Sequence, residues 1–317
     1  MLALHAPGGL DVGQSVLQKP GTMVLAVPCC DSIGQPRDCF ISSSGMHMRD
    51  EECVRLLKSW LPRLGYRWSG YRKVHRTVCK RLHRRLGELG LSGVGAYQDR
   101  LELDPAERSH LDAMCRIPIS RFYRDRSVFD ALRNTVLPNL VERAVAHPDS
   151  MIRCWSCGCA SGEEAYSLRI IWEFTTPPGA RGYHILATDA DPTMLKRAKR
   201  GCYQPGSLRE LPAPMCRRAF ARSGQLYCVR PEFRSAMTFE QQDVRSTLPT
   251  GTFDLILCRN VVFTYFERSL QLQVMRELTD HLEAGGFLVI GQQEHLPSDL
   301  PRIALESPEL PIYSKGL

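Results

Sequence analysis

Apolar residues between positions 51 and 103 recur every three to four residues along the chain. Val78, Leu82 and Leu86, for example, lie four residues apart. This is the period of an amphipathic helix with a single apolar stripe, so it predicts helices throughout the segment. We therefore expect a small all-helical N-terminal domain, including a junction to the next domain, over residues 46–139.

From residue 151 onward the pattern changes to short apolar runs separated by loops and amphipathic segments. The runs are Met151–Ser156, Tyr183–Thr188, Phe253–Cys258 and Phe287–Ile290, with a last candidate at Pro311–Lys315. Helical patterns lie between them, as at Pro192–Lys199 and Leu270–Leu282. Strands that alternate with helices predict a mostly parallel sheet with helices on both faces. We expect a Rossmann-like α/β domain over residues 140–317.

The first 45 residues are rich in Gly, Pro and Ser and have no sustained periodicity, which predicts a flexible extension. Met46 and Met48 stand just before the first helical pattern, so a start codon at that point is an alternative. The chain has no apolar run near the roughly 18 residues that span a bilayer, and its first residues lack a signal-peptide pattern. We expect a cytoplasmic protein without membrane insertion.

The net charge of +7, from 41 basic and 34 acidic residues, favours acidic partners in general. Much of the excess lies in one predicted helix, whose basic residues are Arg72, Lys73, Arg76, Lys80, Arg81, Arg84 and Arg85. Such a surface is either simply solvated or it binds an acidic partner. Like charges four residues apart destabilise a helix, so the second interpretation is a real competitor of the first.

The 13 cysteines are odd in number, and many stand inside apolar runs, as Cys258 does. This distribution predicts free, buried thiols in a reducing compartment. Cys154, Cys157 and Cys159 lack the second pair that a zinc site would need, so no metal site is predicted.

Small and polar residues gather where the predicted strands end, which is where open α/β sheets bind ligands. They are Gly158, Glu163 and Glu164 in the loop 157–164, then Asp189, Asp243–Val244 and Arg259–Asn260. The small residues of the loop allow close approach to the backbone, and its two carboxylates favour a ligand with an amino group over a phosphate. An acid in the place of Asp189 is suited to ribose hydroxyls.

Each of these features also has a structural interpretation. Asp189 could cap the helix that begins at Pro192, and Tyr265 could pack with Phe266 at a helix start. Arg259, at the end of a very apolar strand, must either face a cleft or be paired.

Five segments of the chain together resemble the CheR family, the methyltransferases that esterify glutamates of bacterial chemotaxis receptors. The similar segments are 120–125, 155–167, 187–191, 253–266 and 285–294. The resemblance implies a helical domain packed over a Rossmann-like class I methyltransferase domain. It also implies S-adenosyl-L-methionine as the cofactor, S-adenosyl-L-homocysteine as its product, and no metal.

The matching positions suggest the site residues. The implied cofactor contacts are Ser120, Arg124, Gly158, Glu163, Glu164, Asp189, Asp243, Val244, Arg259 and Asn260. The implied catalytic residues, which would position the acceptor carboxylate, are Arg259, Tyr265 and Arg124. The basic helix over 72–85 would meet an acidic protein surface such as a receptor helix. Nucleic acid is not expected, because the chain lacks an Asn/Asp-Pro-Pro-Tyr/Phe motif for a flipped base.

The chain departs from the family pattern in three places. Pro118 replaces a usual Asn, the run from Arg259 to Tyr265 is one residue longer than usual, and the tail 292–297 is unfamiliar. The segment 203–235, where the family carries a small β-subdomain, shows little strand alternation, so its presence stays open. Two alternatives therefore remain: a methyltransferase with a small-molecule acceptor, and a non-catalytic module that binds the cofactor and signals.

Overall fold

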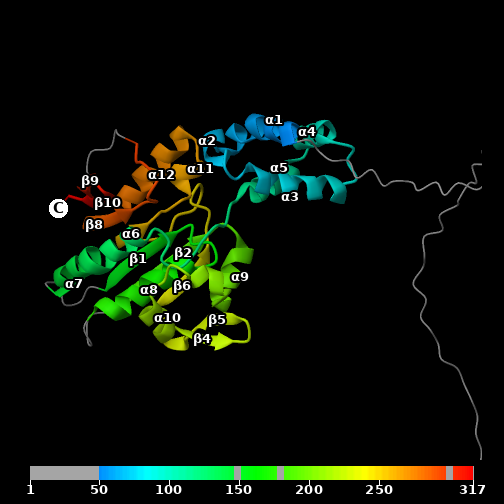
Figure 1. Ribbon diagram of the computed structural model, residues 1–317. Helices are drawn as coiled ribbons and strands as arrows, with labels where there is room; N and C mark the ends of the chain where they lie inside the picture. Colours follow the sequence, from blue (N-terminus) through cyan, green and yellow to red (C-terminus); the bar gives the residue numbers. More distant parts are fainter. Residues whose placement is uncertain (1–49, 146–150, 177–181, 298–302, 317) are drawn as a thin grey trace, which may run out of the picture. The chain divides into compact units, whose positions relative to one another are not determined.

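The computed structural model describes residues 50–145, 151–176, 182–297 and 303–316, all of which belong to one compact unit (Figure 1). The predicted extension over residues 1–45 and the alternative start at Met46 or Met48 lie outside the described residues. In the described part of the chain, no helix is long and apolar enough to cross a membrane.

The N-terminal region is helical, as its apolar period predicts. Its elements are α1 (Asp50–Trp60), η1 (Pro62–Leu64), α2 (Trp68–Tyr71), α3 (His75–Glu88), α4 (Val94–Leu103) and α5 (Pro105–Cys115). The apolar stripe of α3 is buried, with Val78 and Leu82 fully inaccessible. The helix predicted to carry the basic residues begins only at His75, because the chain turns after Tyr71.

Three helical segments then lead to the sheet: α6 (Arg126–Ala131), a π-helical turn η2 (Leu132–Val136) and α7 (Leu137–Val145). The helices between the strands are α8 (Glu163–Thr175), α9 (Pro192–Arg200), α11 (Val262–Tyr265) and α12 (Arg268–Asp280). They alternate with strands, as the sequence pattern predicts, and Figure 1 shows them on both sides of the sheet.

The large sheet has seven strands in the order β6-β2-β1-β7-β8-β10-β9. They are β1 (Ile152–Cys157), β2 (Tyr183–Asp189), β6 (Met237–Gln241), β7 (Phe253–Leu257), β8 (Leu282–Val289), β9 (Ile303–Ser307) and β10 (Leu310–Lys315). The pairs among the first five strands in this order are parallel, and β10 runs antiparallel to both of its neighbours. This arrangement confirms the predicted α/β fold with a mostly parallel sheet.

Two apolar cores cover the two faces of this sheet. Cys154 faces the core that contains α6, α7 and α8, and the next residue of β1, Trp155, faces the core that contains α12. The second core continues without interruption into the N-terminal helices, where it includes Leu57 and Leu82. The helical region and one face of the sheet therefore share a single hydrophobic core.

A separate three-stranded antiparallel sheet lies in the segment whose structure the sequence left open. Its order is β3-β5-β4, with β3 (Cys202–Tyr203), β4 (Phe220–Ser223) and β5 (Leu226–Val229). The short elements η3 (Pro205–Leu208), α10 (Ala213–Ala219) and η4 (Pro231–Phe233) surround it. A small β-subdomain is thus present, and its strands of two to four residues are too short to show an alternating pattern.

The prediction that the cysteines are free is wrong for four of them. Cys53 on α1 is bonded to Cys79 on α3, and Cys202 on β3 is bonded to Cys228 on β5. Each pair is brought together by the packing of elements 26 residues apart, which cysteine spacing alone does not reveal. The remaining described cysteines are free, and all of them except Cys216 are buried.

Candidate functional site

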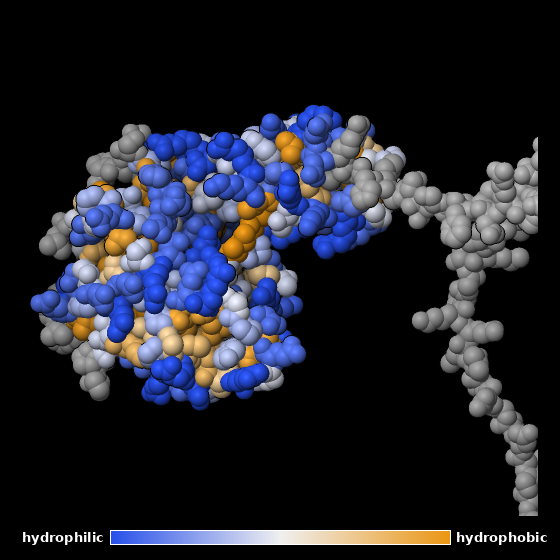
Figure 2. Space-filling view, viewed as in Figure 1, coloured by the Kyte–Doolittle hydropathy of each residue, from blue (hydrophilic) through white to orange (hydrophobic). Residues whose placement is uncertain are grey.

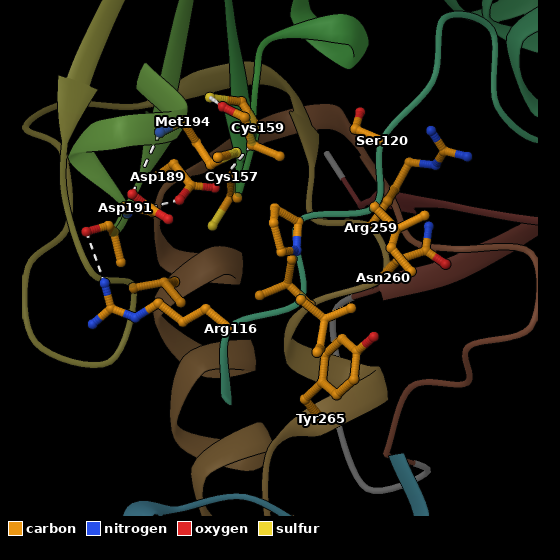
Figure 3. Close-up of a pocket in the computed structure, with 18 of the residues that line it drawn as sticks. Arg116, Ser120, Cys157, Cys159, Asp189, Asp191, Met194, Arg259, Asn260 and Tyr265 are labelled. Atoms are coloured by element: carbon orange, nitrogen blue, oxygen red, sulfur yellow. Dashed lines mark hydrogen bonds between the residues drawn. The ribbon is translucent and has the colours of Figure 1, made fainter. Parts of the chain in front are cut away.

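A cavity with about 1050 Å³ of empty space, part of it open to solvent, lies at the carboxyl ends of the parallel strands. Its walls come from the loops after β1, β2, β6 and β7, from the segment 115–124, and from Tyr66 and Tyr71 of the N-terminal region (Figure 3). Figure 2 shows the hollow between the N-terminal helices and the sheet, with apolar side chains along one wall. All the predicted site residues except Glu163 line this cavity, and their roles stay predictions.

Glu163 lies behind the cavity wall. Its side chain is almost completely buried, and its carboxylate accepts a hydrogen bond from the Ser161 hydroxyl at 2.9 Å. Burial raises the pKa of this carboxyl above its ordinary value. Glu164, the next residue, does line the cavity, so the structure separates two acids that the sequence treats as a pair.

Gly158 brings two cavity loops into close contact. Its φ of +80° lies in the left-handed region, and a Cβ atom at this position would stand 2.6 Å from Cγ2 of Val261. Any larger residue would therefore push apart the loops that follow β1 and β7.

Asp189 ends β2 and faces the cavity, where the backbone around it holds its carboxylate. The two carboxylate oxygens accept the N–H groups of Ala160 and Asp191, both at 2.8 Å. Each oxygen keeps a lone pair for a ligand hydroxyl. The cap of α9 is Asp191, whose side chain accepts the N–H of Thr193 at 2.8 Å. The helix-capping interpretation thus applies to Asp191 and not to Asp189.

Asp243 belongs to an ion-pair network that sequence reasoning missed. Arg245 contacts the carboxylate of Asp243 at 2.6 Å and that of Asp112 on α5 at 2.7 Å. Arg116 pairs with Asp112 at 2.9 Å. Burial alone would raise the pKa of Asp243, but the Arg245 guanidinium outweighs it and holds that pKa below its usual range. The network joins residues more than 100 positions apart, so no local sequence pattern predicts it.

Arg259 has its guanidinium already occupied by two carboxylates. It donates to Glu164 at 3.0 Å and to Asp125 at 2.8 Å, and its side chain is only 2% exposed. Of the three guanidinium nitrogens of Arg259, Nη1 and Nη2 donate hydrogen bonds, and Nε has no partner among the described residues. Of the two interpretations that the sequence allowed, pairing and facing a cleft, the structure shows both.

Tyr265 reaches the cavity although its loop is one residue longer than the family pattern. Its ring contacts that of Tyr71, with centroids 5.1 Å apart, and both Tyr265 and Asn260 line the cavity (Figure 3). Burial raises the pKa of the Tyr265 hydroxyl, and the nearby Arg124 charge offsets part of that effect. Within the described part of the chain, this hydroxyl makes no hydrogen bond and is free to meet a ligand.

Arg124 is the one arginine of the cavity wall without a carboxylate partner among the described residues. Its guanidinium donates to the backbone oxygen of Ile119 at 2.7 Å and to Oδ1 of Asn260 at 3.1 Å. The four other arginines of the wall, which are Arg116, Arg121, Arg245 and Arg259, each pair with an acid. Arg124 therefore keeps its charge available for an anionic group of a ligand.

The polar groups of the cavity define the kind of ligand that fits. Asp189 offers lone pairs to hydroxyl groups, and Arg124 offers a cation to a carboxylate. Gln242 has a buried Oε1 without a hydrogen-bond partner among the described residues, and it can accept from an amino group. A nucleoside that carries an amino group fits Asp189 and Gln242, and Arg124 remains available for a carboxylate.

Comparison with known proteins agrees with this chemistry. The family model described as "CheR methyltransferase, SAM binding domain" matches residues 119–307. A chemotaxis protein methyltransferase of Listeria innocua is 37% identical over 207 residues, which cover 65% of this chain and 76% of the relative. One from Klebsiella aerogenes is 31% identical over 227 residues, covering 69% and 74% of the two chains.

Proposed function

Since the chain belongs to the CheR methyltransferase family and is a methyltransferase that uses S-adenosylmethionine, we propose that its acceptor is a glutamate carboxylate of a chemotaxis receptor. The named relatives are chemotaxis protein methyltransferases, which supports a receptor as the substrate.

The observation that carries the proposal is the pairing state of the cavity arginines. Arg124 has no acid partner within the described part of the chain, and the free hydroxyl of Tyr265 lies at the same end of the cavity. A guanidinium and a phenol that both can donate are suited to hold carboxylate oxygens. Arg259 contributes indirectly, because it fixes Asp125 and Glu164 around this end.

The chemistry needs alignment more than proton transfer. When bound, S-adenosylmethionine supplies a methyl group activated on a sulfonium, and a glutamate acceptor is already ionised at neutral pH. No general base is needed. The residues of the cavity have to orient the acceptor and exclude water, and the aromatic wall of Tyr66, Tyr71 and Phe266 is suited to exclude it.

The basic surface of the N-terminal region supports an acidic partner, but with fewer residues than the sequence suggested. Arg81 and Arg85 are used inside the domain, since Arg81 donates to two backbone oxygens and Arg85 pairs with the buried Glu107. Of the seven basic residues predicted for this surface, four are exposed and have no acid partner among the described residues. They are Arg72, Lys73, Arg76 and Lys80, which we name the basic face. The basic face begins directly after Tyr71, which lines the cavity.

The test is a methylation assay with radiolabelled S-adenosylmethionine. The acceptors are the purified cytoplasmic region of a chemotaxis receptor and, separately, small carboxylic acids. A carboxyl methyl ester releases labelled methanol in alkali, whereas a methylated amine does not. We expect alkali-labile label on the receptor, strongly reduced by Tyr265→Phe and unaffected by Tyr227→Phe on β5, which lies outside the cavity.

The other outcomes separate the alternatives. Label on small acids alone would identify a small-molecule methyltransferase. Binding of S-adenosylhomocysteine without turnover on any acceptor would identify a signalling module. Alkali-stable label on the receptor would exclude a carboxylate as the acceptor.

A further inference from the structure

Glu294, the last residue of the segment 285–294, is a buried carboxylate behind the cavity wall. Glu294 follows β8 and is 6% exposed. It does not line the cavity. Its Oε2 accepts the N–H groups of Asn260 and Gly291, both at 2.7 Å, and its Oε1 accepts the hydroxyl of Thr264 at 2.6 Å. All three partners donate, so the group acts only as an acceptor.

The partners of Glu294 include both ends of the lengthened loop. Asn260 lies directly after Arg259, and Thr264 directly precedes Tyr265. One carboxylate thus bridges a stretch of five residues, with one oxygen at each end. The longer loop, which departs from the family pattern, is thus held by the last residue of the segment 285–294.

The backbone at Asn260 shows why such a bridge is needed. Asn260 has a φ of +58°, a left-handed conformation that costs free energy for a residue other than glycine. Its N–H bond to Glu294 fixes this conformation, and its side chain reaches Arg124. Gly291 permits the approach, because a Cβ there would stand 2.7 Å from Oε2 of Glu294 and 3.0 Å from Oδ1 of Asn260.

The opposite side of the loop is held by the N-terminal region through backbone contacts. Arg67 donates its N–H to the carbonyl of Tyr265 at 2.8 Å, and its side chain donates to the carbonyls of Phe263 and Thr264. A Cβ on Gly70 would stand 2.3 Å from the Thr264 oxygen, so helix α2 lies directly against the loop. With one side fixed in this way, the position of the loop depends on what holds the other side.

We propose that Glu294 is a positioning residue, which sets Asn260 and Tyr265 at the cavity by bridging the two ends of the lengthened loop. The hydrogen bond from the Thr264 hydroxyl forms the second end of this bridge. The proposal rests on the family's methyltransferase site and not on the identity of the acceptor.

The test uses the full chain with four variants: Glu294→Ala, Glu294→Gln, Thr264→Val and, as a matched control, Gln293→Ala, an exposed neighbour. The readouts are the affinity for S-adenosylhomocysteine by calorimetry and the amide hydrogen exchange of peptides that span 259–266. Neither readout needs a methyl acceptor, so a failure of the receptor assay leaves this test intact.

We expect Glu294→Ala to weaken S-adenosylhomocysteine binding by about tenfold, because two backbone N–H groups lose their acceptor. It also speeds amide exchange across the loop. Glu294→Gln keeps the affinity within about threefold, since its amide oxygen can accept both N–H groups and its NH₂ can donate to Thr264. Thr264→Val leaves the affinity near that of the unchanged protein but speeds exchange at the Tyr265 end. Gln293→Ala changes neither readout.

A Glu294→Ala protein that is folded and matches the unchanged protein in both readouts would overturn the proposal. Equal losses in Glu294→Ala and Glu294→Gln would also overturn it, because they would show that the charge matters and the bridge does not. If Glu294→Ala does not fold, Thr264→Val decides, and unchanged exchange at 262–266 would refute the role of the bridge.

Discussion

Two carboxylates at strand ends, Asp189 in the cavity wall and Glu294 behind it, are held in similar ways. Asp189 accepts two backbone N–H groups at the end of β2, and Glu294 accepts two after β8. Asp189 faces the cavity, whereas Glu294 lies behind its wall. The same chemical arrangement therefore serves ligand contact in one place and loop geometry in the other.

The two carboxylates differ in the lone pairs that remain free after these hydrogen bonds. The partners of Asp189 are its own neighbour and the loop after the adjacent strand, and its free lone pairs face the cavity. Glu294 gives its second oxygen to Thr264 and so connects segments 30 residues apart. An acid at a strand end is therefore not always a ligand contact. It can bind a ligand only if lone pairs that face the cavity remain free.

The largest expected effect is on S-adenosylhomocysteine affinity, which should depend more on Asp189 than on Glu294. Asp189→Ala should weaken S-adenosylhomocysteine binding by more than about 100-fold, because it removes the ligand contact and also leaves two N–H groups unpaired. Calorimetric titration measures this, with Asp280→Asn, an exposed acid at the end of α12, as the control. If Asp189→Ala lost no more affinity than Glu294→Ala, the contrast between contact and positioning would be wrong.

A second effect follows from the cavity ion network. Arg245→Met removes the closer of the two guanidinium groups that Asp112 and Asp243 share and leaves only Arg116, so we expect it to lower the free energy of unfolding by about 3 kcal/mol. Denaturant titration measures the change. Arg222→Met, at an exposed position on β4, is the matched control. A loss no greater than that of the control would mean that the network does not join the helices to the sheet.

The pH dependence sharpens the comparison further. Burial raises the pKa of both Asp189 and Glu294, so each takes up a proton at a higher pH than the ordinary value of about 4. Protonation relieves the cost of burying the charge, and the contribution of these groups to stability therefore grows as the pH falls and is lost as it rises. Protonated Asp189 accepts less well, so S-adenosylhomocysteine affinity should decrease over the same interval.

Calorimetry between neutral pH and about pH 5 tests this, with Asp189→Asn as the non-titrating reference. The pH slope should be smaller in that variant. An unchanged slope would assign the dependence to another group.

The smallest effect concerns the basic face. Replacing Lys73 and Arg76 by Gln should raise KM for a receptor acceptor by roughly two- to fivefold, because exposed charge pairs are worth at most about 1 kcal/mol. S-adenosylhomocysteine affinity should not change. Replacing Lys196 and Arg200 by Gln, at two exposed positions on α9 outside the basic face, provides the control for net charge. An unaltered KM at low salt would favour the solvated interpretation of this surface.

The sequence predicted those parts of the molecule that depend on local patterns. The α/β sheet follows from short apolar runs, and the position of Asp189 follows from its place after a strand. The loop before Tyr265 is one residue longer than the family pattern, yet Tyr265 lines the cavity. The contact of Glu294 with that loop joins segments 30 residues apart, so it could not be predicted from a local pattern.

The missed features all depend on contacts between distant segments. Arg245 and Asp112 are 133 positions apart, and the cysteine pairs join elements that no periodicity relates. The small sheet β3-β5-β4 has strands of at most four residues, below the length at which alternation is visible. In physical terms, periodicity reports which face of an element is buried but not which element covers it.

The shared core of the N-terminal helices and the sheet has a practical consequence for dissecting the molecule. The family match begins at residue 119, and a fragment cut there would lack Tyr66, Tyr71 and Asp112. It would expose apolar side chains of the sheet face and leave Arg245 with half of its partners. Such a fragment should aggregate. The sheet domain should therefore be expressed, or fused to another protein, only together with the N-terminal helices.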